Sequence, residues 1–95
     1  IILDPGLGFG KKIEHNFEII RKLPQICAMG FPVLVGPSRK SFIGETLNLP
    51  INQRIEGTMA SITASIMNGA RIVRVHDVKE TRRTVAITEK IIGFS

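Results

Sequence analysis

The sequence contains no tryptophan, no tyrosine and a single cysteine, Cys27. One cysteine makes no internal disulfide, and without a second cysteine neither His15 nor His76 belongs to a metal knuckle. No apolar run approaches the roughly 18 residues that a membrane span needs, and the sequence does not open with a basic n-region followed by an apolar h-region. We therefore expect a cytoplasmic protein without a membrane partner.

The chain is also poor in acidic residues. Eight aspartates and glutamates stand against 13 lysines and arginines, which gives a net charge of +5 and an isoelectric point near 10.0. This balance favours an anionic partner. Nucleic acid is disfavoured, because the basic residues are dispersed as pairs and five phenylalanines are the only aromatic rings for base stacking. A small molecule that carries phosphate fits the charge better.

Ninety-five residues, of which 43% are hydrophobic and 22% charged, are typical of one small globular domain. Within it, a short apolar run is followed by a loop and a helical pattern three times. The three apolar runs, at residues 1–4, 32–36 and 71–76, are predicted strands. Strand–loop–helix repeats of this kind indicate parallel β/α units.

The helices are predicted from apolar residues at helical spacing. The first begins after Gly10, is interrupted by Pro24 and ends at Gly30. The third begins at Asp77, which stands three residues before Glu80 and is predicted to form a capping box with it. The apolar positions are Ile13, Phe17 and Ile20 in the first helix, Ile55, Met59, Ile62 and Ile66 in the second, and Val78, Val85 and Ile92 in the third, with Ile87 and Ile91 on a second face. Two apolar faces on the third helix predict one contact with the sheet and another with a neighbouring subunit or helix.

Three parallel strands need more chain around them. A parallel sheet is covered on both faces, and a closed barrel of β/α units takes about 250 residues. We therefore expect the chain to be the end of a larger α/β protein, whose remaining strands precede Ile1.

Ligands of parallel α/β sheets bind beyond the carboxyl ends of the strands. The third strand end carries Arg74 and His76 on the same face of the strand, by the two-residue alternation. The guanidinium fork suits phosphate oxygens, and the imidazole adds a second donor. The alternative is that Arg74 pairs with a carboxylate on a nearby strand, such as Asp4.

The second strand end reads Ser38-Arg39-Lys40-Ser41 and precedes a short predicted helix. Its backbone N–H groups, hydroxyls and cations favour an anion. On this interpretation Ser41 binds a carboxylate or phosphate, and Lys40 reaches a ring heteroatom or an oxyanion. An ordinary basic surface turn has the same composition and is the alternative.

The first strand end carries Gly6, Gly8 and Gly10 in alternation, without the spacing of a dinucleotide fingerprint. These glycines predict a loop whose backbone approaches a flat ligand, with Phe9 stacking on an aromatic ring. Asp4 ends an apolar strand and requires a hydrogen-bond donor, which the amino and ring N–H edge of a heterocycle would supply. The alternative is that Asp4 only caps the loop.

Taken together, these segments resemble the dihydropteroate synthase family. The matching motifs are Asp-Pro-Gly-x-Gly-Phe-Gly-Lys at residues 4–11, Ser-Arg-Lys-Ser-Phe-Ile-Gly at residues 38–44 and Arg-Val-His-Asp-Val at residues 74–78, in the family's order. Residues 54–60, with their Gly-Thr pair, are similar to the family's penultimate helix. The match spans nearly the whole chain.

The resemblance implies a (β/α)₈ TIM barrel, of which this chain is the last three βα units, with residues 1–95 as the C-terminal portion of a pterin-binding domain. It implies the condensation of 6-hydroxymethyl-7,8-dihydropterin diphosphate with p-aminobenzoate to 7,8-dihydropteroate and diphosphate in folate biosynthesis. It further implies Mg²⁺ as cofactor, no metal ligand within these 95 residues, and a homodimer through the late helices.

The resemblance also assigns the pterin site. Asp4 would hold the amino and ring N–H edge of the pterin, Lys40 its carbonyl and ring-nitrogen side, and Gly36 would line the pocket. Arg74 would pack beside the ring and, with His76, bind the diphosphate. Asp4, Lys40 and Arg74 are thus the expected catalytic residues.

For the second substrate, the resemblance assigns the aminobenzoate to Phe9 and Ser41, in the family's sulfonamide-sensitive region. The family's early strands, which carry the remaining substrate-binding and metal-binding residues, have no counterpart here, so we expect activity only in the full-length protein. Two alternatives stay open. One is a methyltetrahydrofolate-binding domain of a corrinoid methyltransferase, against which the Ser-Arg-Lys-Ser motif counts, and the other is a catalytically silent half-barrel that serves as an interaction subunit.

Overall fold

The computed structural model describes residues 1–7 and 12–93, in which two strand–helix units follow a first extended segment and its helices. None of the helices in this part of the chain has the length and apolarity to cross a membrane. The helices and strands are, in order, α1 (Ile13–Arg21), α2 (Leu23–Cys27), β1 (Leu34–Val35), α3 (Ser41–Leu47), the 3₁₀ helix η1 (Ile51–Gln53), α4 (Ile55–Met67), β2 (Ile72–Val73) and α5 (Val78–Ile92).

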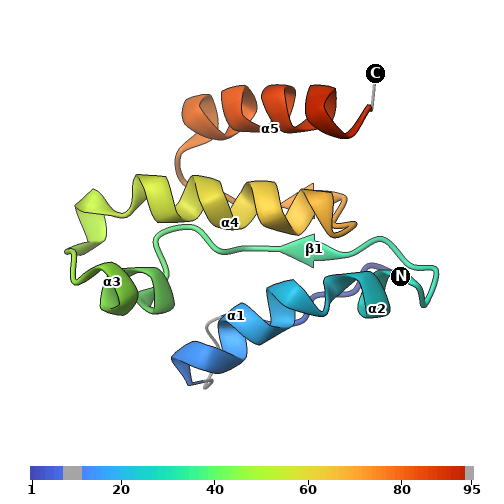
Figure 1. The fold of residues 1–95 in the computed structure, drawn as a ribbon, viewed down its shortest axis with the longest axis horizontal. Helices are drawn as coiled ribbons and strands as arrows, with labels where there is room; N and C mark the ends of the chain where they lie inside the picture. Colours follow the sequence, from blue (N-terminus) through green and yellow to red (C-terminus); the bar gives the residue numbers. More distant parts are fainter. Residues whose placement is uncertain (8–11, 94–95) are drawn as a thin grey trace.

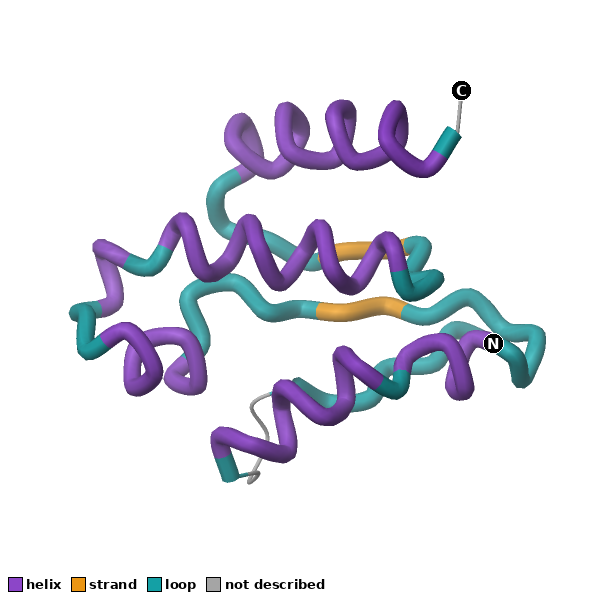
Figure 2. Tube along the Cα trace, viewed as in Figure 1, coloured by secondary structure: helices purple, strands orange, loops and turns teal. Residues whose placement is uncertain are grey.

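The centre of the molecule is a parallel hydrogen-bond ladder. Strand β1 pairs with β2, and on its other edge Val33 forms a parallel bridge with Leu3. Figure 2 shows β1 and β2 next to each other, in orange. The three segments predicted as strands therefore lie side by side in chain order. Only the second and third contain a regular strand, of two residues each, and the first contributes a single bridge at Leu3. The predicted α/β class is confirmed.

The helices cover the ladder from several sides. In Figure 1, α4 runs alongside β1, α5 lies beyond α4, and α1 and α2 lie on the opposite side of β1. Phe17 of α1 and Phe42 of α3 meet edge to face, with ring centroids 5.4 Å apart. The buried core consists of Leu7, Ile20, Leu23, Val33, Val35, Phe42, Ile43 and Ala70.

The break in the first helical segment falls where Pro24 predicts it. Helix α1 ends at Arg21, and α2 starts at Leu23 with the proline in its first turn, where a missing N–H removes no helical hydrogen bond. Gly30 follows with a φ of +92°, the left-handed conformation expected at this exit.

The inner face of α4 is less apolar than predicted. Thr58, Ile62 and Ser65 are fully buried, whereas Met59 and Ile66 of the predicted stripe are half-buried. The hydroxyl of Ser65 donates to a carbonyl one turn back, which satisfies it within the helix. Helix α4 contacts α1 and α3 on one side and α5 on the other (Figure 1). This two-sided cover agrees with the absence of charged residues from Gly57 to Ala70.

Helix α5 packs on α4 through threonines, which corrects the predicted apolar face. Thr81 and Thr88 are buried, and Oγ1 of Thr88 lies 3.0 Å from Oγ1 of Thr63 on α4. Val78, on one of the two predicted apolar faces, is 57% exposed. Periodicity missed the threonines because it counts apolar residues only. The Thr88 hydroxyl is satisfied within its own helix, because it donates to the Thr84 carbonyl at 2.8 Å. The hydroxyl of Thr81 is buried without a hydrogen-bond partner among the described residues.

The predicted capping box at the start of α5 is wrong. Asp77 is the N-cap residue, but its carboxylate makes no bond to the first turn. It accepts two hydrogen bonds from the guanidinium of Arg39 instead, at 3.1 and 2.5 Å. Two charge-assisted hydrogen bonds to a guanidinium are stronger than one N-cap hydrogen bond from a backbone N–H. The Asp77 carboxylate therefore bonds to Arg39 instead of capping the helix.

Gly57 allows a close approach of α4 to α3, and the approach is testable. A Cβ atom at Gly57 would lie 2.3 Å from Cγ2 of Ile43, a buried side chain that is stiff because it branches at Cβ. We expect Gly57→Ala to lower the free energy of unfolding by about 1–2 kcal/mol, because so close a contact places the overpacking cost at the upper end of its usual range, about 2–3 kcal/mol, and the better helix propensity of alanine offsets about 1 kcal/mol.

Urea unfolding of the full-length protein measures this loss. Glu56→Ala, a change at an exposed neighbour on the same helix, is the control and should shift the free energy of unfolding by less than about 0.5 kcal/mol. A Gly57→Ala protein as stable as the unsubstituted protein would contradict the described packing.

Candidate functional site

The carboxyl ends of the three strands meet at one end of the molecule, on the side of α3 in Figure 1. Backbone hydrogen bonds of 2.8 Å from Leu34 to Leu3 and of 2.9 Å from Arg74 to Val35 hold the three segments in register. Parallel pairing therefore brings together side chains that are far apart in the sequence.

Asp4 and Arg74 form an ion pair across this end. Oδ2 of Asp4 accepts a hydrogen bond from Nη2 of Arg74 at 3.1 Å, although the two residues are 70 positions apart. Oδ1 of Asp4 accepts a second bond from the backbone N–H of Gly6 at 2.8 Å. Both alternatives considered for Asp4, the pairing with Arg74 and the capping of the loop, are thus present. The side chains of Arg74 and Asp4 are 64% and 39% exposed, so the pair faces solvent.

Gly36 lies against the side chain of Arg74. A Cβ atom at Gly36 would be 3.5 Å from Nε of Arg74, and Gly36 itself is buried. Any side chain larger than alanine would therefore take up the space beside the guanidinium.

Lys40 points toward the same place. Its Nζ donates to the carbonyl oxygen of Leu7 at 2.6 Å. Partial burial and the positive charge of Arg74 lower the pKa of the Lys40 amine, and the carboxylate of Asp4 opposes this shift. Asp4, Gly36, Lys40 and Arg74 therefore form one group, which we call the strand-end cluster.

The other predicted site residues lie around this cluster or outside the described chain. Ser41 is the first residue of α3 and is exposed. The side chain of His76 is also exposed, and its backbone N–H donates to Oγ of Ser38 at 3.0 Å. The predicted pairing of His76 with Arg74 at a ligand stays a prediction. Phe9 lies outside the described residues.

Sequence reasoning missed the ion pair between Arg39 and Asp77, because it assigned Asp77 to the helix cap. Asp77 is only 10% exposed at its side chain, and the guanidinium of Arg39 holds the pKa of its carboxyl below the usual value. A signal was available. Arg39 and Asp77 each stand a few residues after a strand end, where parallel strands bring opposite charges together.

The described residues do not make a magnesium site. No three His, Cys, Asp or Glu side chains within residues 1–7 and 12–93 lie close enough to share a metal ion. The one carboxylate of the strand-end cluster is paired with Arg74, and the other charged groups of the cluster are cations. This set of groups fits an anion and does not fit Mg²⁺, which prefers carboxylate and phosphate oxygens.

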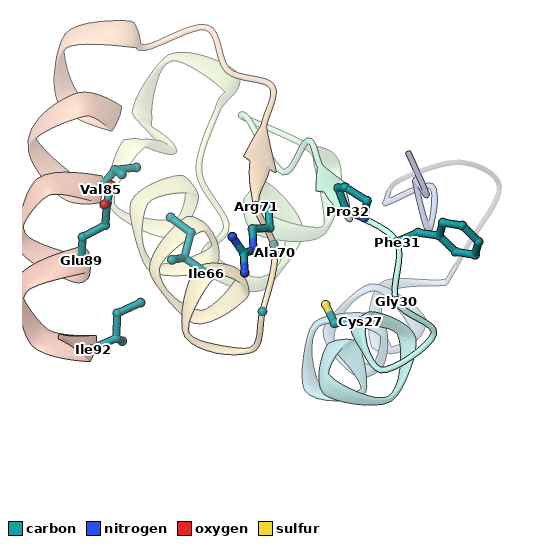
Figure 3. Close-up of a pocket in the computed structure, with 11 residues that line it drawn as sticks. Cys27, Gly30, Phe31, Pro32, Ile66, Ala70, Arg71, Val85, Glu89 and Ile92 are labelled. Atoms are coloured by element: carbon teal, nitrogen blue, oxygen red, sulfur yellow. The ribbon is translucent and has the colours of Figure 1, made fainter. Parts of the chain in front are cut away.

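A cavity of about 720 Å³ lies at the opposite ends of the strands (Figure 3). Its walls include Pro32, Ala70 and Arg71, which precede β1 and β2, and Val85 and Glu89 on α5. None of the predicted site residues in the described chain lines it. The cavity is therefore separate from the strand-end cluster.

The two charges beside Lys40 give opposite, testable effects on its ionisation. Arg74→Met removes the repelling charge and should raise the pKa of Lys40, whereas Asp4→Asn removes the attracting charge and should lower it further. Titration of the ¹³C-labelled lysine ε-carbons by NMR in the full-length protein measures both shifts. Arg21→Met, which neutralises an exposed arginine at the end of α1, is the control and should leave the Lys40 titration unchanged. Equal Lys40 titrations in all three variants would contradict the cluster.

Comparison with known proteins gives consistent matches along the chain. The family model described as pterin binding enzyme matches residues 1–76. The dihydropteroate synthase of Clostridium beijerinckii is 52% identical over 93 residues, which cover 97% of this chain and 35% of that protein.

Two solved structures are similar in fold as well as sequence. A dihydropteroate synthase from Coxiella burnetii in complex with pteroic acid matches with a TM-score of 0.93 and 46% identity, over 96% of this chain and 35% of that chain. The dihydropteroate synthase from Thermus thermophilus in complex with 6HMPPP matches with a TM-score of 0.90 and 44% identity, over 96% of this chain and 37% of that chain.

The chain thus spans about a third of the length of the relatives it matches. The resemblance drawn from three short motifs is confirmed over nearly all of the 95 residues. This chain belongs to the family of pterin-binding enzymes, and its relatives within that family are dihydropteroate synthases.

Proposed function

We propose that the complete protein is a dihydropteroate synthase, which joins 6-hydroxymethyl-7,8-dihydropterin diphosphate to p-aminobenzoate and releases diphosphate. The observation that carries this proposal is the strand-end cluster, in which a carboxylate, a lysine and an arginine surround a glycine at one end of the strands. A flat heterocycle that carries an anionic group requires this combination of acceptor and donors. The relatives' complexes with pteroic acid and 6HMPPP support the same ligand class.

The pterin is assigned to Asp4, Lys40 and Gly36. The Asp4 carboxylate accepts from the amino and ring N–H edge, in place of the bond it now receives from Arg74. Lys40 donates to the carbonyl and ring-nitrogen side, through an amine that is already partly withdrawn from water. Gly36 leaves room for the ring against Arg74.

The leaving diphosphate is assigned to Arg74 and His76. Both side chains of the ion pair between Arg74 and Asp4 are exposed to solvent, and exposed ion pairs contribute little stability. Phosphate oxygens can therefore replace the Asp4 carboxylate as the partner of Arg74. When the bond between the pterin methylene carbon and the diphosphate oxygen breaks, the electron pair leaves with the oxygen and a stabilised pterin methylene cation remains. The amine of p-aminobenzoate then attacks this carbon and loses a proton. Binding the leaving charge and orienting the amine account for the catalysis.

The aminobenzoate is assigned to Ser41 and Phe9. Ser41 opens α3 next to Lys40 and is exposed, so its hydroxyl is available to a carboxylate. This assignment and that of Phe9 rest on the family resemblance.

The rest of the protein completes the site. Residues 1–95 form the C-terminal part of the pterin-binding domain, and the chain supplies the last three units of a (β/α)₈ barrel whose earlier strands carry the remaining ligands, including those near Mg²⁺. The chain alone is inactive on this proposal. A homodimer through the late helices is supported by Ile87 and Ile91 of α5, which are 64% and 65% exposed. The cytoplasmic location remains a prediction from the cysteine content.

Replacement of Lys40 tests the proposed role of its amine. In the full-length enzyme, we expect Lys40→Ala to lower kcat/KM about 100-fold, the cost typical of losing one donor in a preorganised site. Steady-state assays of dihydropteroate formation measure the loss. Lys90→Ala, at an exposed lysine in the last turn of α5, is the matched control and should retain full activity. Turnover of the Lys40→Ala enzyme within a factor of two of the unsubstituted enzyme would overturn the role of Lys40.

Titration of the full-length protein with a sulfonamide, with and without dihydropterin diphosphate, separates the synthase from its alternatives. We expect the sulfonamide to bind only when dihydropterin diphosphate is present, because the occupied pterin site forms part of the aminobenzoate site. Isothermal titration calorimetry measures both affinities. Pterin binding without sulfonamide binding would instead indicate a methyltetrahydrofolate-binding domain, and binding of neither would indicate a silent half-barrel.

A further inference from the structure

Arg39 lies in the loop that follows strand β1. It directly precedes Lys40 and Ser41, the two residues of this loop that the proposed function uses. Its φ is 52°, in the left-handed region that residues with a Cβ atom rarely adopt. Such a conformation persists where the surroundings over-determine it. The contacts that hold Arg39 there are therefore informative.

Each polar group of Arg39 has a partner on another element. Its backbone N–H donates to Oγ1 of Thr58 at 3.0 Å, and its carbonyl accepts from Nη1 of Arg54 at 2.9 Å. Its guanidinium donates to both oxygens of Asp77. Thr58 is fully buried, and Arg54 is itself held by the Leu49 carbonyl at 3.2 Å. The partners of Arg39 are thus fixed in place.

These contacts connect the two loops that carry the strand-end cluster and its neighbours. Asp77 follows His76 directly and lies three residues after Arg74. A second bond joins the same loops, from the backbone N–H of His76 to Oγ of Ser38 at 3.0 Å. The loop that bears Lys40 is therefore cross-linked to the loop that bears Arg74 by the ion pair of Arg39 with Asp77 and by the bond between Ser38 and His76, one residue earlier in each loop.

We propose that Arg39 and Asp77 are positioning residues, whose ion pair holds Lys40 and Ser41 in register with Arg74 without touching substrate. The inference rests on the proposed function for the identity of the substrates. This inference requires Arg39 and Asp77 to act as a unit, because the loss of either side chain removes the ion pair that joins the two loops.

A double-mutant cycle in the full-length enzyme tests the pair. Arg39→Ala and Asp77→Ala should each lower kcat/KM for p-aminobenzoate about tenfold. The double variant should also be about tenfold below the unsubstituted enzyme, rather than about 100-fold, because the effects of two residues that act as a unit do not add. Asp77→Glu, which keeps the charge, should recover activity to within about threefold of the unsubstituted enzyme. Glu18→Ala, which removes the exposed ion pair with Lys22, is the matched control and should not change the kinetics.

Two outcomes would overturn the positioning role. One is an additive loss in the double variant, which means that Arg39 and Asp77 act independently. The other is a loss with Arg39→Ala but none with Asp77→Ala, which means that the guanidinium binds substrate itself.

Amide hydrogen exchange gives a readout that does not depend on the reaction. Exchange over residues 38–41 should be faster in Asp77→Ala than in the unsubstituted protein and unchanged in Glu18→Ala. Equal exchange in all three proteins would overturn the positioning role. If the unsubstituted full-length protein forms no dihydropteroate, the proposed function fails, while the exchange comparison still decides whether the pair orders the loop.

A further pair of variants covers the case in which Asp77→Ala folds poorly. Asp77→Asn removes the charge of the carboxylate at nearly constant size, and Asp77→Glu keeps the charge. Faster exchange over residues 38–41 in the asparagine variant than in the glutamate variant supports the inference, and equal exchange contradicts it.

Discussion

The parallel pairing of Leu3, β1 and β2 is the constraint on which the rest of the molecule depends. Because parallel strands end at the same edge, this pairing alone brings Asp4 next to Arg74, although most of the chain separates them. The connecting helices run back along the ladder, so every loop that follows a strand opens at the same end. A site of three chain segments is thus a consequence of the backbone topology, and the side chains determine only its chemistry.

The charges at this end are arranged in two layers. In the outer layer, the pair of Asp4 with Arg74 faces solvent and can exchange its partners for ligand atoms. In the inner layer, Asp77 is nearly buried and bonds to Arg39 at two points, so this pair is suited to hold loops together. The same residue types therefore serve binding in one place and positioning in the other, and the difference lies in their burial.

Much of the fold was predictable because local signals are strong here. The three apolar runs, the break at Pro24 and the exit at Gly30 were all located from sequence, since each depends on backbone properties of a few adjacent residues. The contact between α4 and α5 was not predictable. It uses Thr81 and Thr88 rather than an apolar stripe. The Thr88 hydroxyl has partners on α4 and in its own helix, whereas the Thr81 hydroxyl is buried without a hydrogen-bond partner among the described residues, so residue type alone does not indicate which threonines are buried.

The sequence by itself determined the elements, their order, the residue types at each strand end and, through three spaced motifs, the family. Those properties are local or are carried by residue identity. Only the tertiary structure decided which charges pair: Asp77 bonds to Arg39 rather than capping its own helix, and the charge of Arg74 and the burial of Lys40 act together on the lysine pKa. The reason is physical, because electrostatic energies depend on distance and on exposure to water, and both are defined only when distant segments have packed.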